Sequence, residues 1–176
     1  MSPIRPGAGA AAILRRAVAD DAPRLAALAC WVWLDSYATH GVESRFLPYL
    51  ATSFTPAAFE RLIADPQQAL WLAEGESGAL QGFAQIRQGV PAPAAEPLLL
   101  ELERLYVAPP CTGHGVGARL LAAARGNWPG QALWLSVWVG NERAQRFYRR
   151  EGGRVVGETD FMLDGQPIRN LVIALP

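Results

Sequence analysis

A glycine-rich turn in the second half of the chain is the segment whose residue types point most directly to chemistry. It runs Leu105-Tyr106-Val107-Ala108-Pro109-Pro110-Cys111-Thr112-Gly113-His114-Gly115-Val116-Gly117-Ala118, so a strand-like run leads into three alternating glycines and a helix-like segment. Glycines let the backbone approach a phosphate closely, and the free N–H groups at a helix start attract an anion. The turn therefore predicts a phosphate site, and a glycine-rich loop without a ligand is the alternative.

Two common phosphate-binding motifs do not fit this turn. Gly113, Gly115 and Ala118 have the spacing of a dinucleotide-binding loop, which needs an acidic residue about 20 positions further on. Residues 118–141 contain no Asp or Glu. A Walker loop needs a lysine, and all 16 basic residues are arginines. The same composition excludes a Schiff base and a lysine-bound pyridoxal phosphate.

A second motif follows downstream, in the order Trp134-Leu135-Ser136-Val137, Asn141, Ala144, Phe147-Tyr148 and Gly152. Together with the glycine turn, it resembles the GNAT superfamily of acetyl-CoA-dependent N-acetyltransferases over about residues 98–153. The segments 133–138 and 161–164 are most similar to the subgroup of bacterial polyamine (spermidine/spermine-type) acetyltransferases. The resemblance implies a GNAT-like fold, with acetyl-CoA as co-substrate and an amine as acceptor.

The resemblance also implies roles for individual residues. Backbone groups of Leu105 and Val107 would pair with the pantetheine arm like an added strand, and the glycine turn would hold the pyrophosphate. Asn141 would contact the cofactor arm, and Tyr148 would lie near the thioester sulfur. The cofactor-binding set that it implies is Leu105, Tyr106, Val107, Thr112, Gly113, His114, Gly115, Val116, Gly117, Ala118, Asn141, Ala144 and Tyr148.

Acetyl transfer to an amine requires proton movements that three side chains could perform. An alkyl ammonium, with a pKa of about 10.4, must lose a proton before it attacks the thioester. Glu103 or Glu101 is the expected base, a backbone N–H near Val107 would stabilise the oxyanion, and Tyr148 would protonate the departing thiolate. We therefore expect direct attack by a primary amine of a small molecule or peptide.

Three positions depart from the family pattern. Thr112 stands where the family usually has Gln or Arg, which leaves a threonine to cap the helix and weakens the expected hold on the cofactor. Gly153 stands where a core phenylalanine is usual. Arg169, in the final strand, is basic where the polyamine-like subgroup tends to be acidic or polar, which argues against a polycationic acceptor.

Other interpretations of the same residues remain open. Tyr148 lies on an apolar helical stripe and could be a core residue, and both glutamates could be solvated. Trp31, Trp33 and Tyr37 could either wall an acceptor pocket or simply pack. At the level of the whole chain, the alternatives are a non-catalytic acyl-CoA-binding sensor and an interaction module that uses exposed tryptophans.

The elements that must position these residues follow from apolar spacing and turn residues. Strands are expected at 13–17, 69–74, 80–87, 98–107, 133–137, 154–160 and 170–175. Helices are expected at about 20–38 and 55–65, from about Val116, and through Ala144 to Tyr148, with an Asp cap at 20–21 and a Thr55 cap. The order β α α β β β α β α β β predicts a single-domain α/β fold, a mixed sheet of about seven strands flanked by about four helices.

Length and composition bound the class of protein. The chain has 176 residues, 51% hydrophobic and 18% charged, and its 16 basic and 16 acidic residues leave no net charge. These values predict one globular domain at 13–176 after a loose leader at 1–12, with no dedicated nucleic-acid surface. Neither a signal sequence nor a membrane-spanning run is apparent, two cysteines are too few for a disulfide framework, and no metal-ligand cluster stands out. We expect a cytoplasmic enzyme without a metal, with a homodimer as the alternative to a monomer.

Overall fold

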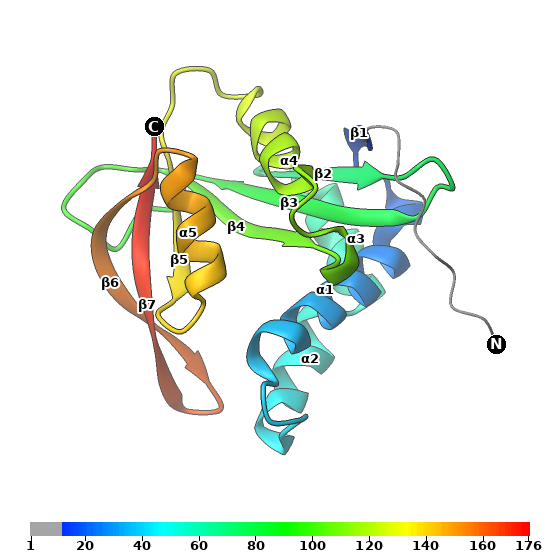
Figure 1. The fold of residues 1–176 in the computed structure, drawn as a ribbon, viewed down its shortest axis with the longest axis horizontal. Coiled ribbons are helices and arrows are strands. Elements are labelled where there is room, and N and C mark those ends of the chain that lie inside the picture. Colours follow the sequence, from blue (N-terminus) through cyan, green and yellow to red (C-terminus); the bar gives the residue numbers. More distant parts are fainter. Residues whose placement is uncertain (1–11) are drawn as a thin grey trace.

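One seven-stranded mixed sheet organises residues 12–176, which are the residues that the computed structural model describes (Figure 1). Its strands are β1 (Ile13–Arg16), β2 (Gln68–Glu74), β3 (Leu80–Gln88), β4 (Leu100–Val107), β5 (Leu133–Trp138), β6 (Arg154–Leu163) and β7 (Gln166–Leu175). The helices are α1 (Ala22–Tyr37), α2 (Leu47–Ser53), α3 (Pro56–Ala64), α4 (Val116–Arg125) and α5 (Glu142–Arg150). The strand order is β1-β2-β3-β4-β5-β7-β6.

The pairing between β4 and β5 is the irregular feature of this sheet. It is the parallel pair among antiparallel neighbours, and it covers only Leu100 opposite Leu133 and Glu101 opposite Trp134. Beyond these residues the two strands diverge, as Figure 1 shows. Where the register of β4 against β3 shifts, Gln85 pairs with Arg104 and Ile86 with Leu102, so Glu103 is the extra residue of a β-bulge.

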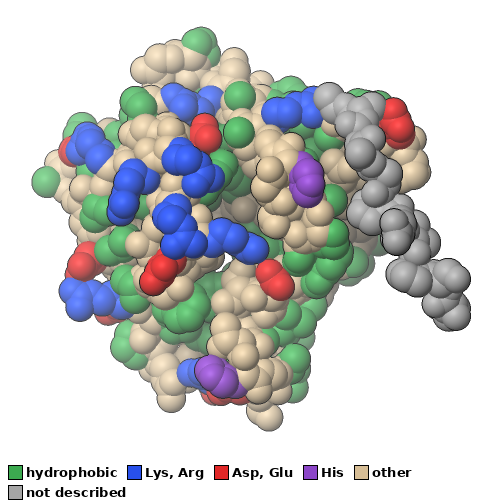
Figure 2. Space-filling model, viewed as in Figure 1, with side chains coloured by type: hydrophobic (Ala, Val, Ile, Leu, Met, Phe, Trp, Pro, Cys, Tyr) green, Lys and Arg blue, Asp and Glu red, His purple; other side chains and the backbone are tan. Residues whose placement is uncertain are grey.

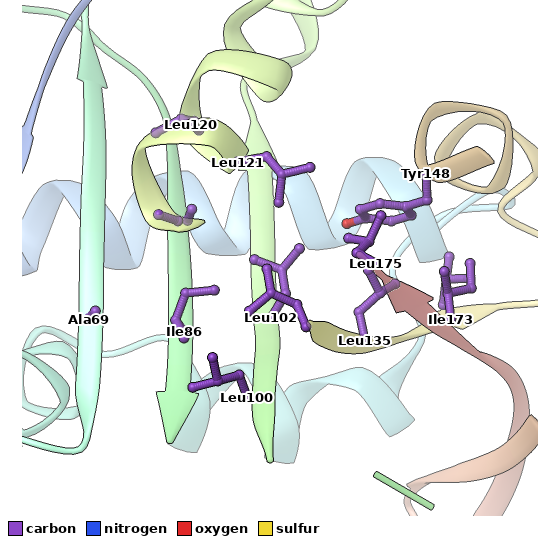
Figure 3. Packing of buried hydrophobic residues seen from close by; sticks show 14 of the residues in the cluster. Ala69, Ile86, Leu100, Leu102, Leu120, Leu121, Leu135, Tyr148, Ile173 and Leu175 are labelled. Atoms are coloured by element: carbon purple, nitrogen blue, oxygen red, sulfur yellow. The ribbon is translucent and has the colours of Figure 1, made fainter. Parts of the chain in front are cut away.

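Two hydrophobic clusters cover the two faces of the sheet. One lies under α4 and α5 and includes Leu120, Leu121 and Tyr148 (Figure 3). The other lies under α1 and α3 and includes Phe59 and Phe83, both fully buried. Since both faces of the sheet are covered, β2 and β5 consist largely of buried apolar residues. In β4, the residues from Glu103 onward are only half-buried.

The observed elements confirm the predicted fold class and show one more helix than expected. Helix α2 was not anticipated, because none of its seven residues is buried and it therefore carries no apolar periodicity. Thr55 caps α3 as predicted, since its Oγ1 accepts a hydrogen bond from the Ala58 N–H at 3.1 Å. Residues 1–11 of the expected leader lie outside the described part of the chain, and Ala12, its last residue, is buried in the core.

The expected aspartate cap at the start of α1 is wrong. Asp21 precedes the helix, but its carboxylate does not cap α1. Instead it accepts hydrogen bonds from Arg15 Nη1 at 2.7 Å and from the Val18 N–H at 2.9 Å, and it also pairs with Arg24. Arginines from β1 and α1 thus compete successfully for the carboxylate.

Among residues 12–176, no helix is both long enough and apolar enough to span a lipid bilayer.

Candidate active site

A cleft of about 590 Å³ opens where β4 and β5 diverge. Residues of α1, β4, the glycine turn, β5, α5 and β7 line it. Figure 2 shows arginine side chains gathered over the face that carries α5, with the surface hollowed beside them. The cleft therefore lies between segments that are far apart in sequence, and the glycine turn forms part of its wall.

The glycine turn presents an uncapped helix start to this cleft. Gly113 and Gly115 have φ angles of +82° and +79°, and a Cβ at either position would meet no atom within 4 Å, so backbone conformation alone selects glycine there. Gly115 precedes α4, and no side chain caps the first N–H groups of the helix. Such groups are available to an anion, and the helix dipole favours binding there.

The predicted threonine cap of α4 is wrong. The Thr112 hydroxyl donates a hydrogen bond to the Pro109 carbonyl at 2.8 Å, within the short 3-10 turn that precedes the glycines. The helix begins later than the cap prediction assumed, with Gly115 in the N-cap position. Thr112 therefore stabilises the turn and leaves the helix start open.

The open edge of β4 provides hydrogen-bonding groups along the same cleft. The Ala108 N–H donates to the Gln81 carbonyl at 2.8 Å, at the start of β3. Because successive N–H groups of a strand point in opposite directions, those of Leu105 and Val107 point away from β3, toward β5. No residue of β5 pairs with them, since the β4–β5 register ends at Glu101. This edge fits an extended ligand that carries amide groups.

Helix α5 and its N-cap contribute three of the predicted residues to the cleft, which are Asn141, Ala144 and Tyr148. Asn141 is the N-cap of the helix, and its Oδ1 accepts a hydrogen bond from the Ala144 N–H at 3.0 Å. The Tyr148 ring is 8% exposed and packs edge-on against Phe147 at 5.1 Å. Figure 3 shows its hydroxyl directed from α5 toward β4. Burial raises the pKa of Tyr148, which keeps the phenol protonated. Tyr148 thus both packs in the core and lines the cleft.

Both predicted glutamates lie in the cleft beside arginines. Glu103 Oε2 accepts a hydrogen bond from Arg87 Nη1 at 2.5 Å. The same nitrogen lies 3.2 Å from Glu101 Oε2, without hydrogen-bond geometry. Burial, helped by the negative charge of Glu103 and opposed by Arg87, raises the pKa of Glu101 to about 7. A carboxyl group with that pKa can both accept and release a proton near neutral pH.

Two of the aromatic residues considered on α1 line the cleft, together with several residues that the sequence did not indicate. Tyr37 stacks on Trp33 at 4.7 Å and on Trp138 at 5.5 Å, and burial raises the pKa of Tyr37 to about 12. Of the aromatic residues considered on α1, Trp33 and Tyr37 therefore line the cleft, and Trp31 is 49% exposed elsewhere. Additional lining residues are Tyr49, Arg104, Ser136, Phe161 and Asn170. Their scatter along the chain gives no local signal.

The cleft does not include every residue in the expected set. His114 is exposed and Val116 is buried in the core, so the cleft wall excludes both side chains. Arg169 points to solvent and pairs with Glu158 at 2.8 Å, and its neighbour Asn170 faces the cleft. Arg169 therefore does not face the acceptor region of the cleft and does not oppose a polycationic acceptor.

Gly153 is required by close packing. A Cβ at this position would lie 2.7 Å from the Tyr148 carbonyl oxygen and 2.9 Å from Ile173 Cγ2. A larger residue would have to displace backbone, so the absent aromatic side chain has no space here.

Within residues 12–176, no group of three or more His, Cys, Asp or Glu side chains is arranged to hold a metal ion.

Comparison of the sequence with known proteins identifies a family that matches most of the chain. A family model described as "Acetyltransferase (GNAT) family" matches residues 27–153. An uncharacterized N-acetyltransferase of Mycobacterium tuberculosis is 28% identical over 146 residues, which cover 81% of this chain and 89% of that protein. The N-alpha-acetyltransferase RimI of the same organism is 32% identical over 102 residues, or 58% of this chain and 62% of that protein.

A solved structure shares the fold over almost the whole chain. The PaiA N-acetyltransferase of Thermoplasma acidophilum, in complex with coenzyme A, superposes with a TM-score of 0.70 at 20% identity. The match covers 94% of this chain and 99% of that one. The diverging central strands are thus set in an architecture shared with a coenzyme A-binding protein.

Proposed function

Since the chain belongs to the GNAT family of acetyltransferases and uses acetyl-CoA, we propose that it transfers the acetyl group directly to a primary amine of a small molecule or peptide. The observation that carries this proposal is the convergence of three features on one cleft. These are the uncapped start of α4, the open edge of β4, and the pair Glu101 and Glu103. An anion site, a strand-like amide site and a base are the parts that the reaction needs.

The cofactor would be held mainly by backbone groups. The turn at 113–118 would bind the pyrophosphate through the free N–H groups of α4, and Leu105 and Val107 would pair with the pantetheine arm. Asn141 and Tyr148 both line the cleft from α5, so both could contact the same arm. Acetyl-CoA supplies the activated acyl group, and the protein positions it and moves protons.

Proton removal from the acceptor is the proposed task of the glutamate pair. An alkyl ammonium would be attracted between Glu103 and Glu101, and one of these carboxylates would take its proton. Arg87 holds Glu103 in place, and the raised pKa of Glu101, about 7, suits a base that works near neutral pH. The freed amine nitrogen then attacks the acyl carbon and forms the N–C bond. It releases its second proton to solvent, and the C–S bond breaks as the thiolate leaves.

Proton delivery to the departing sulfur is the proposed task of Tyr148. Its hydroxyl is kept protonated by burial and is directed from α5 toward β4 (Figure 3). A phenol can protonate a thiolate or stabilise its charge by hydrogen bonding as it leaves. The N–H of Val107 would stabilise negative charge on the acyl oxygen.

The experiment that tests the proposal is thiol release from acetyl-CoA with a panel of amines. The panel contains polyamines, aminoglycosides, amino acids and peptides with free N-termini. We expect release that requires both the protein and one class of amine, with the acetylated amine detected by mass spectrometry. Binding of acetyl-CoA without release for any amine would contradict the proposal.

Polyamines are a second candidate class of acceptor. The resemblance to polyamine acetyltransferases implies them, and Glu101 and Glu103 could attract a polycation.

The reaction would take place in the cytoplasm. The two free cysteine thiols support this location, because cytoplasmic proteins keep their cysteines reduced. We also propose that the protein forms a homodimer, which light scattering of the purified protein would detect.

A further inference from the structure

Arg104 is a charged residue of the cleft whose guanidinium is left incompletely paired. Its side chain is only 10% exposed and lies over the Phe54 ring at 5.7 Å. Its Nη1 donates to Gln85 Oε1, and Gln85 in turn donates to Gln68 Oε1 at 2.8 Å. Its Nε has no hydrogen-bond partner among the residues that the structure describes. Buried charges are normally paired, so this guanidinium requires an explanation.

The nearest carboxylate does not neutralise Arg104 fully. Glu103 Oε1 lies 3.7 Å from Arg104 Nη2, beyond hydrogen-bond distance, because Glu103 is bonded to Arg87 through its other oxygen. Burial lowers the pKa of Arg104, but Tyr106, Glu103 and Tyr49 raise it by more, so the side chain stays charged. A cationic group thus remains available in the cleft beside the carboxylates that would receive the acceptor amine.

The spacing of these two opposite charges matches one kind of amine. In an α-amino acid, the amine nitrogen and the carboxyl carbon are bonded to the same carbon and lie about 2.5 Å apart. Glu103 Oε1 and Arg104 Nη2 are 3.7 Å apart. A zwitterion of this size can therefore place its ammonium against Glu103 and its carboxylate against Arg104. A polyamine has no group for Arg104, and a peptide N-terminus carries a neutral amide in place of the carboxylate.

An aromatic wall on the same side of the cleft provides space for an apolar side chain. Tyr49 packs edge-on against Phe161 at 5.3 Å, and Tyr37 stacks on Trp138 at 5.5 Å. These four residues come from α1, α2, β5 and β6, and all of them line the cleft. Aromatic rings of this kind bind large apolar groups with specific geometry.

We propose that the acceptor is a free α-amino acid with a large apolar side chain, whose carboxylate is bound by Arg104. The proposal rests on the acetyl-transfer function described above and narrows its acceptor. Arg104 is the specificity-determining residue, Glu103 and Glu101 receive the amine, and the aromatic wall receives the side chain. Deprotonation, N–C bond formation and thiol release are those already described, so no further reactant is needed.

Three matched acceptors test the role of the carboxylate. L-Phenylalanine, L-phenylalaninamide and phenethylamine share an aromatic side chain and a primary amine, and only the first carries a carboxylate. The amines of the three acceptors differ in basicity. For each acceptor, we therefore compare the KM of the variant with the KM of the wild type. For Arg104→Gln, we expect the KM for L-phenylalanine to rise at least tenfold, with kcat changed less than about twofold. The KM values for the other two acceptors should stay within about twofold.

Two further variants separate recognition from folding. Arg104→Lys keeps the charge and should retain part of the preference for L-phenylalanine. Arg154→Gln removes an exposed arginine that pairs with Glu96 outside the cleft, and it should leave all KM values unchanged. Calorimetry with coenzyme A and thermal melting should show that Arg104→Gln retains cofactor affinity and the folded state.

The outcomes distinguish the two proposals. A rise in KM that is equal for all three acceptors in Arg104→Gln would overturn the inference and leave acetyl transfer intact. If Arg104→Gln does not fold, the changes in KM that Arg104→Lys causes for the same three acceptors decide, and an equal change for all three would overturn the inference. Absence of thiol release with every amine would instead overturn the proposed function itself.

Discussion

At the residue scale, Gly115 tests how the cofactor is held. Its φ of +79° directly before α4 is unfavourable for any β-branched residue, and a side chain there would stand in the proposed pyrophosphate site. We expect Gly115→Val to weaken acetyl-CoA binding more than tenfold, or roughly 2 kcal/mol, measured by calorimetry.

A matched glycine separates backbone strain from ligand contact. Gly130 has a φ of +78°, a Cβ there would meet no atom within 4 Å, and the residue lies outside the cleft. Gly130→Val should therefore carry similar strain without changing the affinity for acetyl-CoA. Unchanged affinity in Gly115→Val would remove the turn from the binding site.

Tyr148 separates proton delivery from packing. Tyr148→Phe keeps the buried ring and its contact with Phe147 and removes only the hydroxyl. We expect kcat to fall about 10²-fold, at the low end for acid catalysis, with cofactor affinity and melting temperature nearly unchanged. Steady-state kinetics, calorimetry and thermal melting measure the three quantities. Wild-type turnover in this variant would make Tyr148 a packing residue.

The two glutamates should leave distinct signatures in the pH–rate profile. The pKa of Glu101 is about 7, so wild-type turnover should rise with pH through this value as the carboxylate forms. Glu101→Gln should remove that inflection, with the largest loss near neutral pH and partial recovery in alkali as the amine deprotonates in solution. Glu103→Gln removes a negative neighbour, so the inflection should move to lower pH. Identical profiles for all three proteins would assign deprotonation to other groups.

At the element scale, an ion-pair cluster joins β1, the start of α1 and β2. Arg15 pairs with Asp21 at 2.7 Å and with Glu74 at 2.8 Å, and Arg24 pairs with the same two carboxylates. Asp21 is 2% exposed, whereas the arginine side chains are 33% and 40% exposed. The cluster therefore combines a buried carboxylate with arginines that water partly screens. Substitution of Asp21 should for this reason cost more stability than substitution of any other member.

Asp21→Asn should lower the free energy of unfolding by about 2 kcal/mol at neutral pH, less than for a fully buried pair because the arginines are screened. Hydrogen bonds from Arg15 hold the pKa of Asp21 well below its usual range, against the effect of burial. The stabilisation is thus complete above about pH 3.9, the unfolded value, and is lost as the pH falls through the folded pKa. Urea unfolding at pH 7 and pH 3 measures this change. Asp20→Asn, at an exposed neighbour, is the control, and an equal effect of the two variants would contradict the prediction.

At the scale of the whole molecule, the short β4–β5 pairing joins the two halves of the sheet and leaves room for the cleft. Leu133 lies in this seam, is fully buried and pairs with Leu100. We expect Leu133→Ala to lower the free energy of unfolding by about 2–5 kcal/mol, because it leaves a cavity in the buried cluster under α4 and α5. Leu99→Ala, at a 55% exposed position next to the seam, should change it by less than about 0.5 kcal/mol. Chemical unfolding of both variants is the measurement, and similar stability would show that the seam does not hold the halves together.

Local sequence determined a large part of the fold and the side of the cleft where we propose that the cofactor binds. The strands, the cap at Thr55 and the left-handed glycines at 113 and 115 follow from preferences of a few adjacent residues, and these preferences persist in the folded chain. The order of the elements then sufficed to predict a mixed α/β sheet, although α2, which buries no residue, left no periodic signal.

Only the tertiary structure decided what surrounds the proposed acceptor site. Regular alternation would place Glu103 and Arg104 on opposite faces of β4, but the β-bulge at Glu103 brings their head groups to 3.7 Å. Burial of Glu101, and its raised pKa, depends on segments that meet only when the sheet forms. The aromatic wall joins residues as distant as Tyr37 and Phe161. The proposed acceptor side is therefore built from long-range contacts and one register shift, neither of which is encoded in the spacing of neighbouring residues.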